Sequence, residues 1–266
     1  MTALDWKDKP VSIELFDLTG KLALVTGSTR GLGNALIRGL ARAGANVIVH
    51  GRSLERAQDE ADKIAEETGV QAFAVSFDVT DVDETNSAIA SVLEKIGVPD
   101  ILVNNAGMQS RAPFNEFDPA NWNAVIATNL SSAFYVSQPI TRAMAERGSG
   151  KVINIGSVMS MLARQTIAPY SASKGGIAML SRGMAADLAR YNIQVNTISP
   201  GYFASEMNVA LTSDPKFDAW VKERTPAGRW GDFEELVGAL VFLSSAASQF
   251  VSGQNIFVDG GMTSVV

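Results

Sequence analysis

The sequence predicts an α/β fold in which a doubly wound parallel sheet carries helices on both faces, and three observations predict it. Short runs rich in β-branched residues alternate with longer amphipathic segments, and such alternation requires crossover connections between parallel strands. Several of these runs are almost entirely apolar, as strands are when both faces of a sheet are covered. A chain of 266 residues is also short enough for one large core.

The expected elements follow this alternation along the chain. We expect strands at Leu22–Thr26, Asn46–His50, Gln71–Ser76, Asp100–Asn104, Lys151–Ile155, Gln194–Ser199 and Asn255–Val258. Helix-period segments lie between them, including Asn34–Ala43 and Trp122–Gln138. No composition break or repeat divides the chain, so residues 18–266 are expected to form a single domain. Residues 1–17 are expected to be an N-terminal arm outside its core.

One irregular stretch, from about Pro200 to Gly231, is rich in Pro, Asp, Ser and Trp. It is longer than an ordinary connection in a compact domain. We therefore expect residues 200–231 to form a lid over a substrate pocket.

Charge and composition exclude several classes of protein. The net charge is −6 and the isoelectric point is about 4.9, whereas nucleic acids and anionic membranes require clustered Lys and Arg. Neither nucleic acids nor membranes are expected as partners.

With no cysteine, disulfides and Cys-ligated zinc are excluded, and we expect no metal site. The N-terminus lacks the apolar region of a signal peptide and no apolar run reaches about 18 residues, so we expect a soluble cytoplasmic protein.

A glycine-rich turn follows the first expected strand and opens a helix. It consists of Gly27, Ser28, Thr29, Arg30, Gly31, Leu32 and Gly33. Glycines permit a tight turn and a close backbone approach, while the helix N-terminus presents free N–H groups to a diphosphate. An ordinary strand-to-helix turn can carry the same glycines, so the turn alone does not establish nucleotide binding.

The segment at the end of the second expected strand bears on the choice of dinucleotide. An enzyme that uses NAD is expected to carry an acid there for the ribose hydroxyls, whereas this chain has Arg52. An arginine suits the 2′-phosphate of NADP, and Arg30 offers a second cation for it. We therefore expect NADP as the cofactor, with NAD as the alternative. Two solvated loop arginines would give the same sequence.

Four polar residues are candidates for catalysis. Tyr170 and Lys174 lie four residues apart at the start of a helix, where a nearby ammonium favours the phenolate and lowers the pKa of Tyr170 toward neutral pH. Ser157 follows a strand at the carboxyl edge of the sheet, where a hydroxyl can polarise a carbonyl. Asn129 lies on a largely apolar helix, and a packing role is as open as a functional one. A Tyr-x-x-x-Lys pair alone is common on solvated helices.

Together these residues resemble the short-chain dehydrogenase/reductase family, from Leu18 to Gly261. The resemblance is carried by the glycine turn, Asp78-Val79, Asn104-Asn105-Ala106-Gly107, Asn129, Ser157, Tyr170, Lys174 and Pro200-Gly201. It implies a Rossmann-type seven-stranded sheet, a dinucleotide-binding catalytic domain and a homotetramer.

The resemblance also implies roles. Tyr170 would be the acid/base, Lys174 would lower its pKa and hold the nicotinamide ribose, Ser157 would orient the substrate and Asn129 would keep a proton-relay water. The remaining cofactor contacts would be Asp78 and Val79 to adenine, Asn105, Ala106 and Gly107 along the cleft, and Pro200, Gly201, Phe203 and Ser205 at the nicotinamide. Gly156 and Ser205 depart from the serine and threonine usual in the family.

The resemblance extends, in segments such as residues 98–111 and 201–208, to members of the family that act on sugar acids. It implies the interconversion of gluconate and 5-ketogluconate, a small-molecule substrate. Its carboxylate would be held by Arg111, or by Arg164 as a second candidate, with surface arginines as the alternative. A 3-oxoacyl-thioester reductase and a non-catalytic nucleotide-binding regulator remain open. A serine hydrolase is excluded, because Ser157 lacks the nucleophile elbow and the single histidine, His50, lies beside the ribose site.

Overall fold

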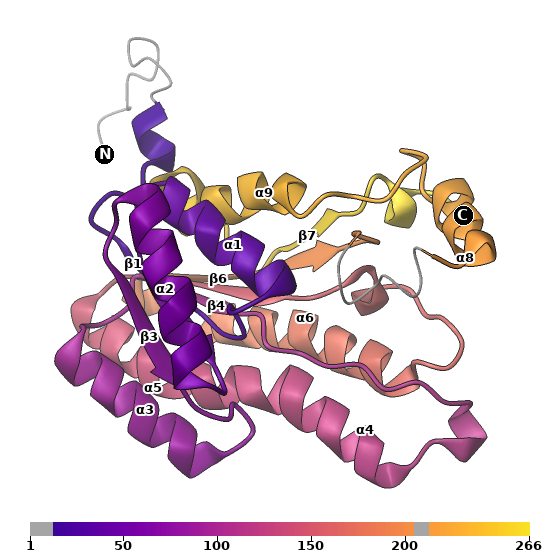
Figure 1. The fold of residues 1–266 in the computed structure, drawn as a ribbon, viewed down its shortest axis with the longest axis horizontal. Coiled ribbons are helices and arrows are strands. Elements are labelled where there is room, and N and C mark those ends of the chain that lie inside the picture. Colours follow the sequence, from indigo (N-terminus) through magenta and orange to yellow (C-terminus); the bar gives the residue numbers. More distant parts are fainter. Residues whose placement is uncertain (1–12, 205–212) are drawn as a thin grey trace.

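The computed structural model describes residues 13–204 and 213–266. Within them one seven-stranded sheet has the order β3-β2-β1-β4-β5-β6-β7, and every neighbouring pair is parallel (Figure 1). The strands are β1 (Leu22–Val25), β2 (Asn46–Gly51), β3 (Ala72–Ser76), β4 (Ile101–Asn104), β5 (Gly150–Ile155), β6 (Ile193–Pro200) and β7 (Asn255–Val258). Every expected strand is confirmed to within one residue at either end.

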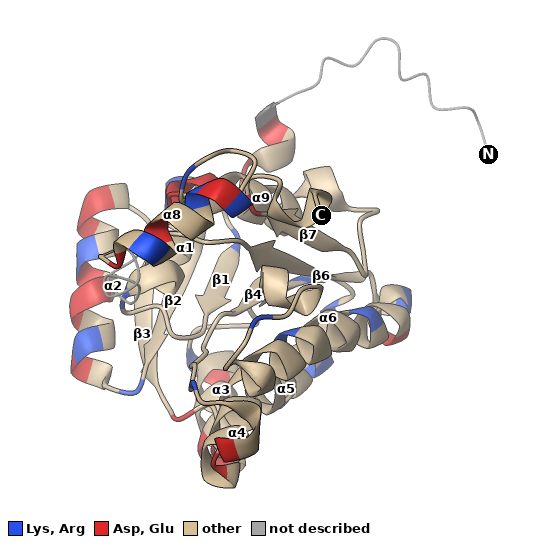
Figure 2. Ribbon diagram, turned by 90° about the vertical axis from the view of Figure 1, so that its right-hand side faces the viewer, with Lys and Arg blue, Asp and Glu red and all other residues tan. Residues whose placement is uncertain are grey.

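Helices cover both faces of the sheet (Figures 1 and 2). On one face lie α1 (Gly31–Arg42), α2 (Leu54–Thr68) and α9 (Glu234–Ser244); on the other lie α3 (Val82–Lys95), α4 (Pro119–Ile126), α5 (Ser132–Arg147) and α6 (Ala168–Leu188). Helix α8 (Pro215–Arg224) lies beyond the edge of the sheet. The short helices are η2 (Ile13–Phe16), η3 (Phe114–Glu116), the π-helix η4 (Ala127–Ser131), η5 (Val158–Ser160), η6 (Ala189–Tyr191), η8 (Ala246–Ser248) and η9 (Met262–Ser264).

Alternate residues of the central strands enter two separate apolar layers. Val25 of β1 packs in the layer that contains Leu36 of α1, whereas its neighbour Leu24 packs in the layer that contains Ile89 of α3 and Ile140 of α5. All five side chains are fully buried, and each such burial contributes about 1.5–3 kcal/mol. The apolar runs in the sequence are therefore explained by a sheet that is buried on both faces.

The topology defines where a ligand can bind. Strand β1 pairs with β2 on one side and with β4 on the other, so the order of the strands reverses beside β1. Because all strands are parallel, their carboxyl ends meet at one edge, and the crevice beside such a reversal is where open α/β sheets bind ligands.

The expected helix Trp122–Gln138 is interrupted in the structure. Helix α4 ends at Ile126, the wider π-turn of η4 follows, and α5 begins at Ser132. Turns of this kind are common at functional sites, and Asn129 lies inside this one.

The expected arm and lid are described only in part. Leu18 is buried in the core, Ile13–Phe16 forms η2, and residues 1–12 of the arm lie outside the described residues. In the lid, Phe203 forms a β-bridge with Gly231 and α8 lies between them, while residues 205–212 lie outside the described part. None of the helices within residues 13–204 and 213–266 is both long and apolar enough to cross a membrane.

Candidate active site

The glycine turn requires glycine at two positions for different reasons. Gly31 has a φ of +58°, which lies in the left-handed region that side chains disfavour. Gly33 lies in the first turn of α1, where an added Cβ would stand 2.2 Å from the carbonyl oxygen of Gly27. No side chain caps the N-terminus of α1, so its N–H groups are available to an anion.

Hydrogen bonds hold the turn against the segment after β4. The Thr26 hydroxyl accepts from the backbone N–H groups of Asn105 (2.9 Å) and Ala106 (3.0 Å). In return the Asn105 side-chain amide donates to the carbonyl oxygens of Thr26 (2.9 Å) and Gly27 (3.2 Å). The expected cleft residues Asn105, Ala106 and Gly107 therefore follow β4 directly beside the expected diphosphate site.

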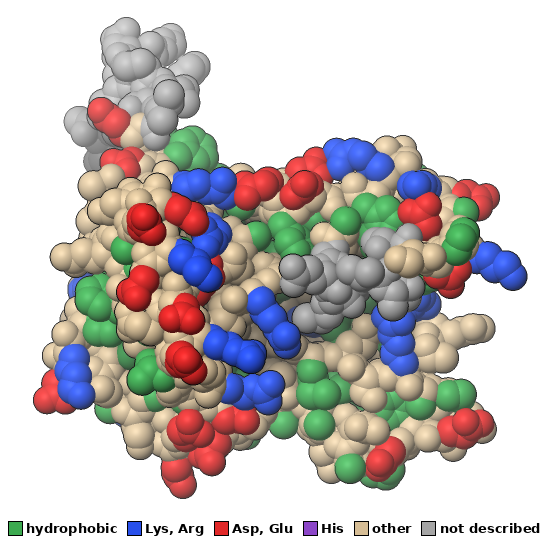
Figure 3. Space-filling view, viewed as in Figure 1, with side chains coloured by type: hydrophobic (Ala, Val, Ile, Leu, Met, Phe, Trp, Pro, Cys, Tyr) green, Lys and Arg blue, Asp and Glu red, His purple; other side chains and the backbone are tan. Residues whose placement is uncertain are grey.

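The expected adenosine end also gathers at this edge. Arg30 precedes α1 and Arg52 follows β2, and both are exposed. Asp78 accepts hydrogen bonds from the backbone and hydroxyl of Thr80, which lower its pKa, and Arg52 lowers it further. Val79 is buried beside it. Figure 3 shows basic side chains gathered at the centre of one face, between α1 and the lower end of α2.

The histidine imidazole has a structural task that the sequence did not reveal. His50 is buried, its Nδ1 accepts from the Gly27 N–H (2.9 Å), and its Nε2 lies 3.1 Å from the carbonyl oxygen of Phe77. Nδ1 is therefore the acceptor, and Nε2 carries the proton that it donates to Phe77. Both ring nitrogens of His50 are therefore bonded to backbone groups, and neither is available as a base for a serine nucleophile. This agrees with the exclusion of a serine hydrolase.

Three expected catalytic side chains lie together beyond the end of β5. Ser157 precedes η5 and is buried, and its Oγ accepts from the Met159 N–H (3.2 Å). Its hydroxyl proton remains available on the side of the Tyr170 phenol, whose pKa Ser157 lowers. Lys174 lies 5.6 Å from the centre of the Tyr170 ring and donates to the Ile155 carbonyl oxygen (2.7 Å).

The protonation of this pair differs from the sequence-based expectation. Burial raises the pKa of Tyr170, the hydrogen bond from Ser157 opposes that rise, and Tyr202 adds to it. Burial also lowers the pKa of Lys174 to about 8. The pKa of Tyr170 thus shifts away from neutral pH, opposite in direction to the shift expected from Lys174, because desolvation of the buried phenol is its largest cause. The phenol is therefore protonated at neutral pH.

Asn129 connects two walls of the site through its side-chain amide. Its Oδ1 accepts from the Met108 N–H (2.7 Å), and its Nδ2 donates to the Met108 carbonyl oxygen (2.9 Å) and to the Ser173 hydroxyl (3.2 Å). Ser173 lies in α6, between Tyr170 and Lys174. The amide therefore ties the segment after β4 to the helix that carries the expected acid/base.

The expected nicotinamide cover begins where β6 ends. Pro200 is the last residue of β6, and a Cβ on Gly201 would stand 2.8 Å from the Cα of Asp259. Phe203 is buried and stacks on Phe233, with 6.2 Å between ring centroids. Ser205 lies outside the described residues.

The departure at Gly156 has a physical cause. An added Cβ there would stand 2.4 Å from the Oγ of Ser199 and 2.8 Å from the Cγ2 of Thr197, both on β6. A serine would therefore require these neighbouring side chains to shift.

Arg111 and Arg164 approach the site on different loops. Arg111 follows β4 and donates to the Gln109 side chain (3.2 Å), and Arg164 lies between η5 and α6. Partial burial lowers the pKa of Arg111, and the like charge of Arg164 lowers it further. The two guanidinium groups are therefore close enough for their charges to interact. Within the described residues, no group of three or more His, Cys, Asp or Glu side chains is arranged to hold a metal ion.

Sequence reasoning missed Tyr202 as a separate site residue. Its ring packs edge-on against Phe217 (5.7 Å), Trp220 (5.6 Å) and Trp230 (5.8 Å), all three from the expected lid. The aromatic residues of this stretch were the available signal, but their convergence on one tyrosine depends on tertiary packing.

Fold, glycine turn and catalytic set together define a dinucleotide-dependent oxidoreductase, and comparison with known proteins identifies its family. A family model described as enoyl-(acyl carrier protein) reductase matches residues 27–263. The chain belongs to the short-chain dehydrogenase/reductase family.

Particular relatives are similar over nearly their whole length. The chain is 53% identical to the 5-keto-D-gluconate 5-reductase of Escherichia coli (strain K12), over 94% of this chain and 98% of that protein. It is 50% identical to the gluconate 5-dehydrogenase of Gluconobacter oxydans (strain 621H), over 94% of this chain and 97% of that protein. A crystal structure of a gluconate 5-dehydrogenase from Burkholderia cenocepacia J2315 in complex with NADP and tartrate matches with a TM-score of 0.93 and 51% identity, covering 95% of this chain and 99% of that one.

Proposed function

We propose that this chain is an NADP(H)-dependent oxidoreductase that interconverts gluconate and 5-ketogluconate. The observation that carries the proposal is the gathering of Ser157, Tyr170 and Lys174 beyond the end of β5, where Lys174 donates to the last carbonyl of that strand and lies 5.6 Å from the centre of the Tyr170 ring. Relatives of 50–53% identity carry the same pair of substrates in their names.

The residues around the glycine turn fit NADP. The uncapped N-terminus of α1 suits the diphosphate. Because Gly33 lies close to the carbonyl of Gly27 and carries no side chain, only backbone atoms line this part of the turn. Arg30 and Arg52 suit the 2′-phosphate, and Asp78 and Val79 suit the adenine. We assign the cleft to Asn105, Ala106 and Gly107 and the nicotinamide contacts to Pro200, Gly201, Phe203 and Ser205.

The reaction needs a proton at the oxygen of the reacting carbon. When bound, the reduced nicotinamide supplies the hydride to that carbon. Tyr170, protonated at neutral pH, gives its phenolic proton to the carbonyl oxygen, which becomes a hydroxyl. Ser157 donates a hydrogen bond to the same oxygen and orients it. Oxidation reverses these transfers, and Tyr170 then accepts the proton.

Two further residues support this proton transfer. Lys174, still charged below its pKa of about 8, offsets the negative charge that the phenol acquires and holds the nicotinamide ribose. Asn129 keeps the water that resupplies the proton, since its amide already joins the two walls beside Tyr170.

At the far end of the substrate, we assign Arg111 to the carboxylate. The loop after β4 carries it to the edge where ligands of open sheets enter. We further propose that residues 200–231 close over this end as a lid and that residues 18–266 act as one catalytic domain behind a short N-terminal arm.

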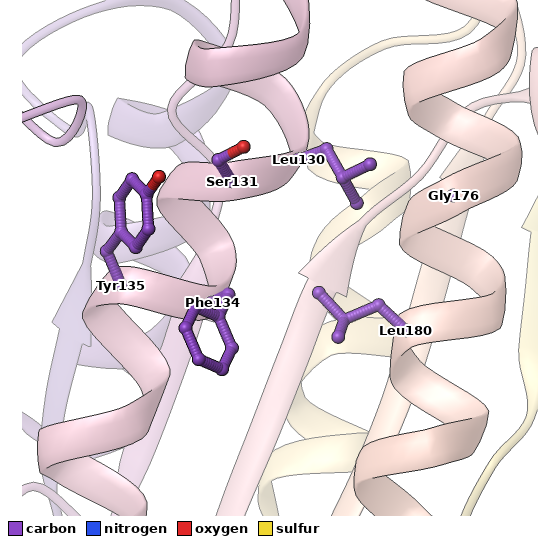
Figure 4. Close-up of a pocket in the computed structure, with 6 residues that line it drawn as sticks. All are labelled: Leu130, Ser131, Phe134, Tyr135, Gly176 and Leu180. Carbon is purple, nitrogen blue, oxygen red and sulfur yellow. The ribbon is translucent and has the colours of Figure 1, made fainter.

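We also propose a homotetramer that works in the cytoplasm, where NADP(H) is available and a chain without cysteine needs no oxidising compartment. A groove of about 460 Å³ supports the assembly. It is lined by Leu130, Ser131, Phe134, Tyr135, Gly176 and Leu180 from η4, α5 and α6 (Figure 4). Phe134 is 46% exposed there, and exposed apolar surface of this kind is typical of protein interfaces.

Initial rates followed at the nicotinamide absorbance test the function. Wild type should reduce 5-ketogluconate and oxidise gluconate with NADP(H), and should be inactive on acyl thioesters.

The Tyr170→Phe variant keeps the ring but has no transferable proton, so turnover should fall about 10²–10⁴-fold while NADPH still binds. Because the pKa of Tyr170 is raised, oxidation should accelerate as the pH rises above neutral, whereas reduction should not. Turnover of the variant above a tenth of wild type, or wild-type activity on thioesters alone, contradicts the proposal.

A further inference from the structure

Two arginines lie on one side of the candidate site. Arg111 and Arg164 come from separate loops, and a hydrogen bond joins these loops, from the Ala112 N–H to the Thr166 carbonyl oxygen (3.1 Å). The charge of Arg164 accordingly lowers the pKa of Arg111. Among the described residues neither forms an ion pair, whereas Arg38, Arg42 and Arg229 all pair with glutamates. Like charges brought together repel unless an anion lies between them.

Among the described residues, an aromatic ring contacts the Arg164 guanidinium, and no hydrogen bond holds it. Its guanidinium carbon lies 5.1 Å from the centre of the Phe217 ring of α8, and its buried Nε has no hydrogen-bond partner in the described part of the chain. A guanidinium stacked in this way keeps its planar fork free for a carboxylate.

Tyr202 lies between the arginines and the reacting end. Its ring packs on Phe217, over which Arg164 lies. Tyr202 and Tyr170 also pack against the same buried apolar cluster. Tyr202 is affected by both arginines, which lower its pKa against the rise caused by burial. Tyr202 in turn raises the pKa of Tyr170. The arginine pair and the expected acid/base therefore lie around one tyrosine, which is the arrangement needed by a substrate with an anionic end and a reacting carbon at the other.

We propose that Arg164 is a specificity-determining residue that joins Arg111 in one two-cation site for the substrate carboxylate, with Phe217 of α8 as its support. This inference rests on the proposed function and deepens it, because it makes the two arginines a single site instead of alternatives. A carboxylate between them removes their repulsion and gains charge-assisted hydrogen bonds from both. A neutral polyol gains neither, so the site selects acids.

The test compares Arg164→Gln, which removes the charge but keeps donors, with Arg164→Lys, which keeps the charge. Arg142→Gln is the matched control, since Arg142 is exposed on α5. Tartrate is the binding probe, and titration is followed by the fluorescence of the tryptophans, of which Trp220 and Trp230 lie beside Tyr202. In parallel, kcat/KM is measured for gluconate and for sorbitol, its neutral counterpart.

We expect Arg164→Gln to weaken tartrate binding and kcat/KM for gluconate by about ten- to a hundredfold, with sorbitol unaffected. Arg164→Lys should recover part of the loss, and Arg142→Gln should match wild type. Unchanged tartrate affinity in Arg164→Gln, or equal losses on gluconate and sorbitol, overturns the inference even if the enzyme oxidises gluconate. Loss of tartrate binding in Arg164→Gln, in an enzyme that is inactive on every sugar acid, leaves the site standing and overturns the proposed function.

Discussion

At the scale of a single residue, the proposed contact of Arg52 with the 2′-phosphate predicts the cofactor preference. It stands where an enzyme for NAD would carry an acid, and its charge already acts on Asp78 nearby. The Arg52→Asp variant should weaken NADPH, because attraction to the 2′-phosphate is replaced by repulsion, and should give the ribose hydroxyls of NADH a partner.

The ratio of kcat/KM for NADPH to that for NADH measures this shift. We expect it to fall by at least tenfold, since a charge-assisted bond contributes about 1.5–3 kcal/mol. Arg56→Asp, an exposed arginine on α2, is the control for added negative charge. A ratio that does not move would mean that the 2′-phosphate is bound elsewhere.

His50 gives the protein a pH dependence that one substitution isolates. Burial lowers its pKa from 6.5 to about 4, and its two hydrogen bonds require the neutral ring. Between these two pH values the unfolded chain binds a proton that the folded chain does not, so the free energy of unfolding falls as the pH drops from 6.5 toward 4. Because the chain has no other histidine, the His50→Asn variant lacks this contribution entirely.

Urea unfolding at pH 7 and at pH 5 measures this contribution. Between these values wild type should lose about 2 kcal/mol more than His50→Asn, which can still accept from Gly27 but cannot titrate. The carboxylates are common to both proteins and cancel in the comparison. An equal loss in the two proteins would show that His50 is protonated in the folded state without cost.

At the scale of elements, the strands were predictable and the irregular turns were not. Each strand corresponds to an apolar run between polar segments of the sequence. For this reason the expected bounds of β1 to β7 agree with the structure to within one residue. The π-turn at Asn129 adds one residue per turn to a stretch whose composition suits an α-helix throughout, so no local pattern marks it. Likewise, the sequence shows Gly156 only as a departure from the family, and the structure shows that side chains of β6 occupy the space beside it.

For the whole molecule, the parallel topology explains why residues far apart in sequence meet. Every βα connection returns the chain to the same edge, so the glycine turn after β1, Ser157 after β5 and Pro200 at the end of β6 are gathered there. That gathering was predictable. The pairing of Arg111 with Arg164 was not, because both lie on loops whose course depends on long-range packing.

At the scale of the whole molecule, the proposed homotetramer needs an uncovered apolar surface. Phe134 and its neighbours line an open apolar groove formed by η4, α5 and α6. If this groove is an interface of the proposed homotetramer, Phe134→Asp should dissociate the tetramer, because a carboxylate in an apolar interface has no compensating partner. Sedimentation equilibrium should then report a smaller species whose circular dichroism still matches wild type.

Phe114→Asp is the control, since Phe114 is 80% exposed on η3, outside the groove. A Phe134→Asp protein that sediments as wild type does, at concentrations near the dissociation constant, would mean that the subunits meet through another face.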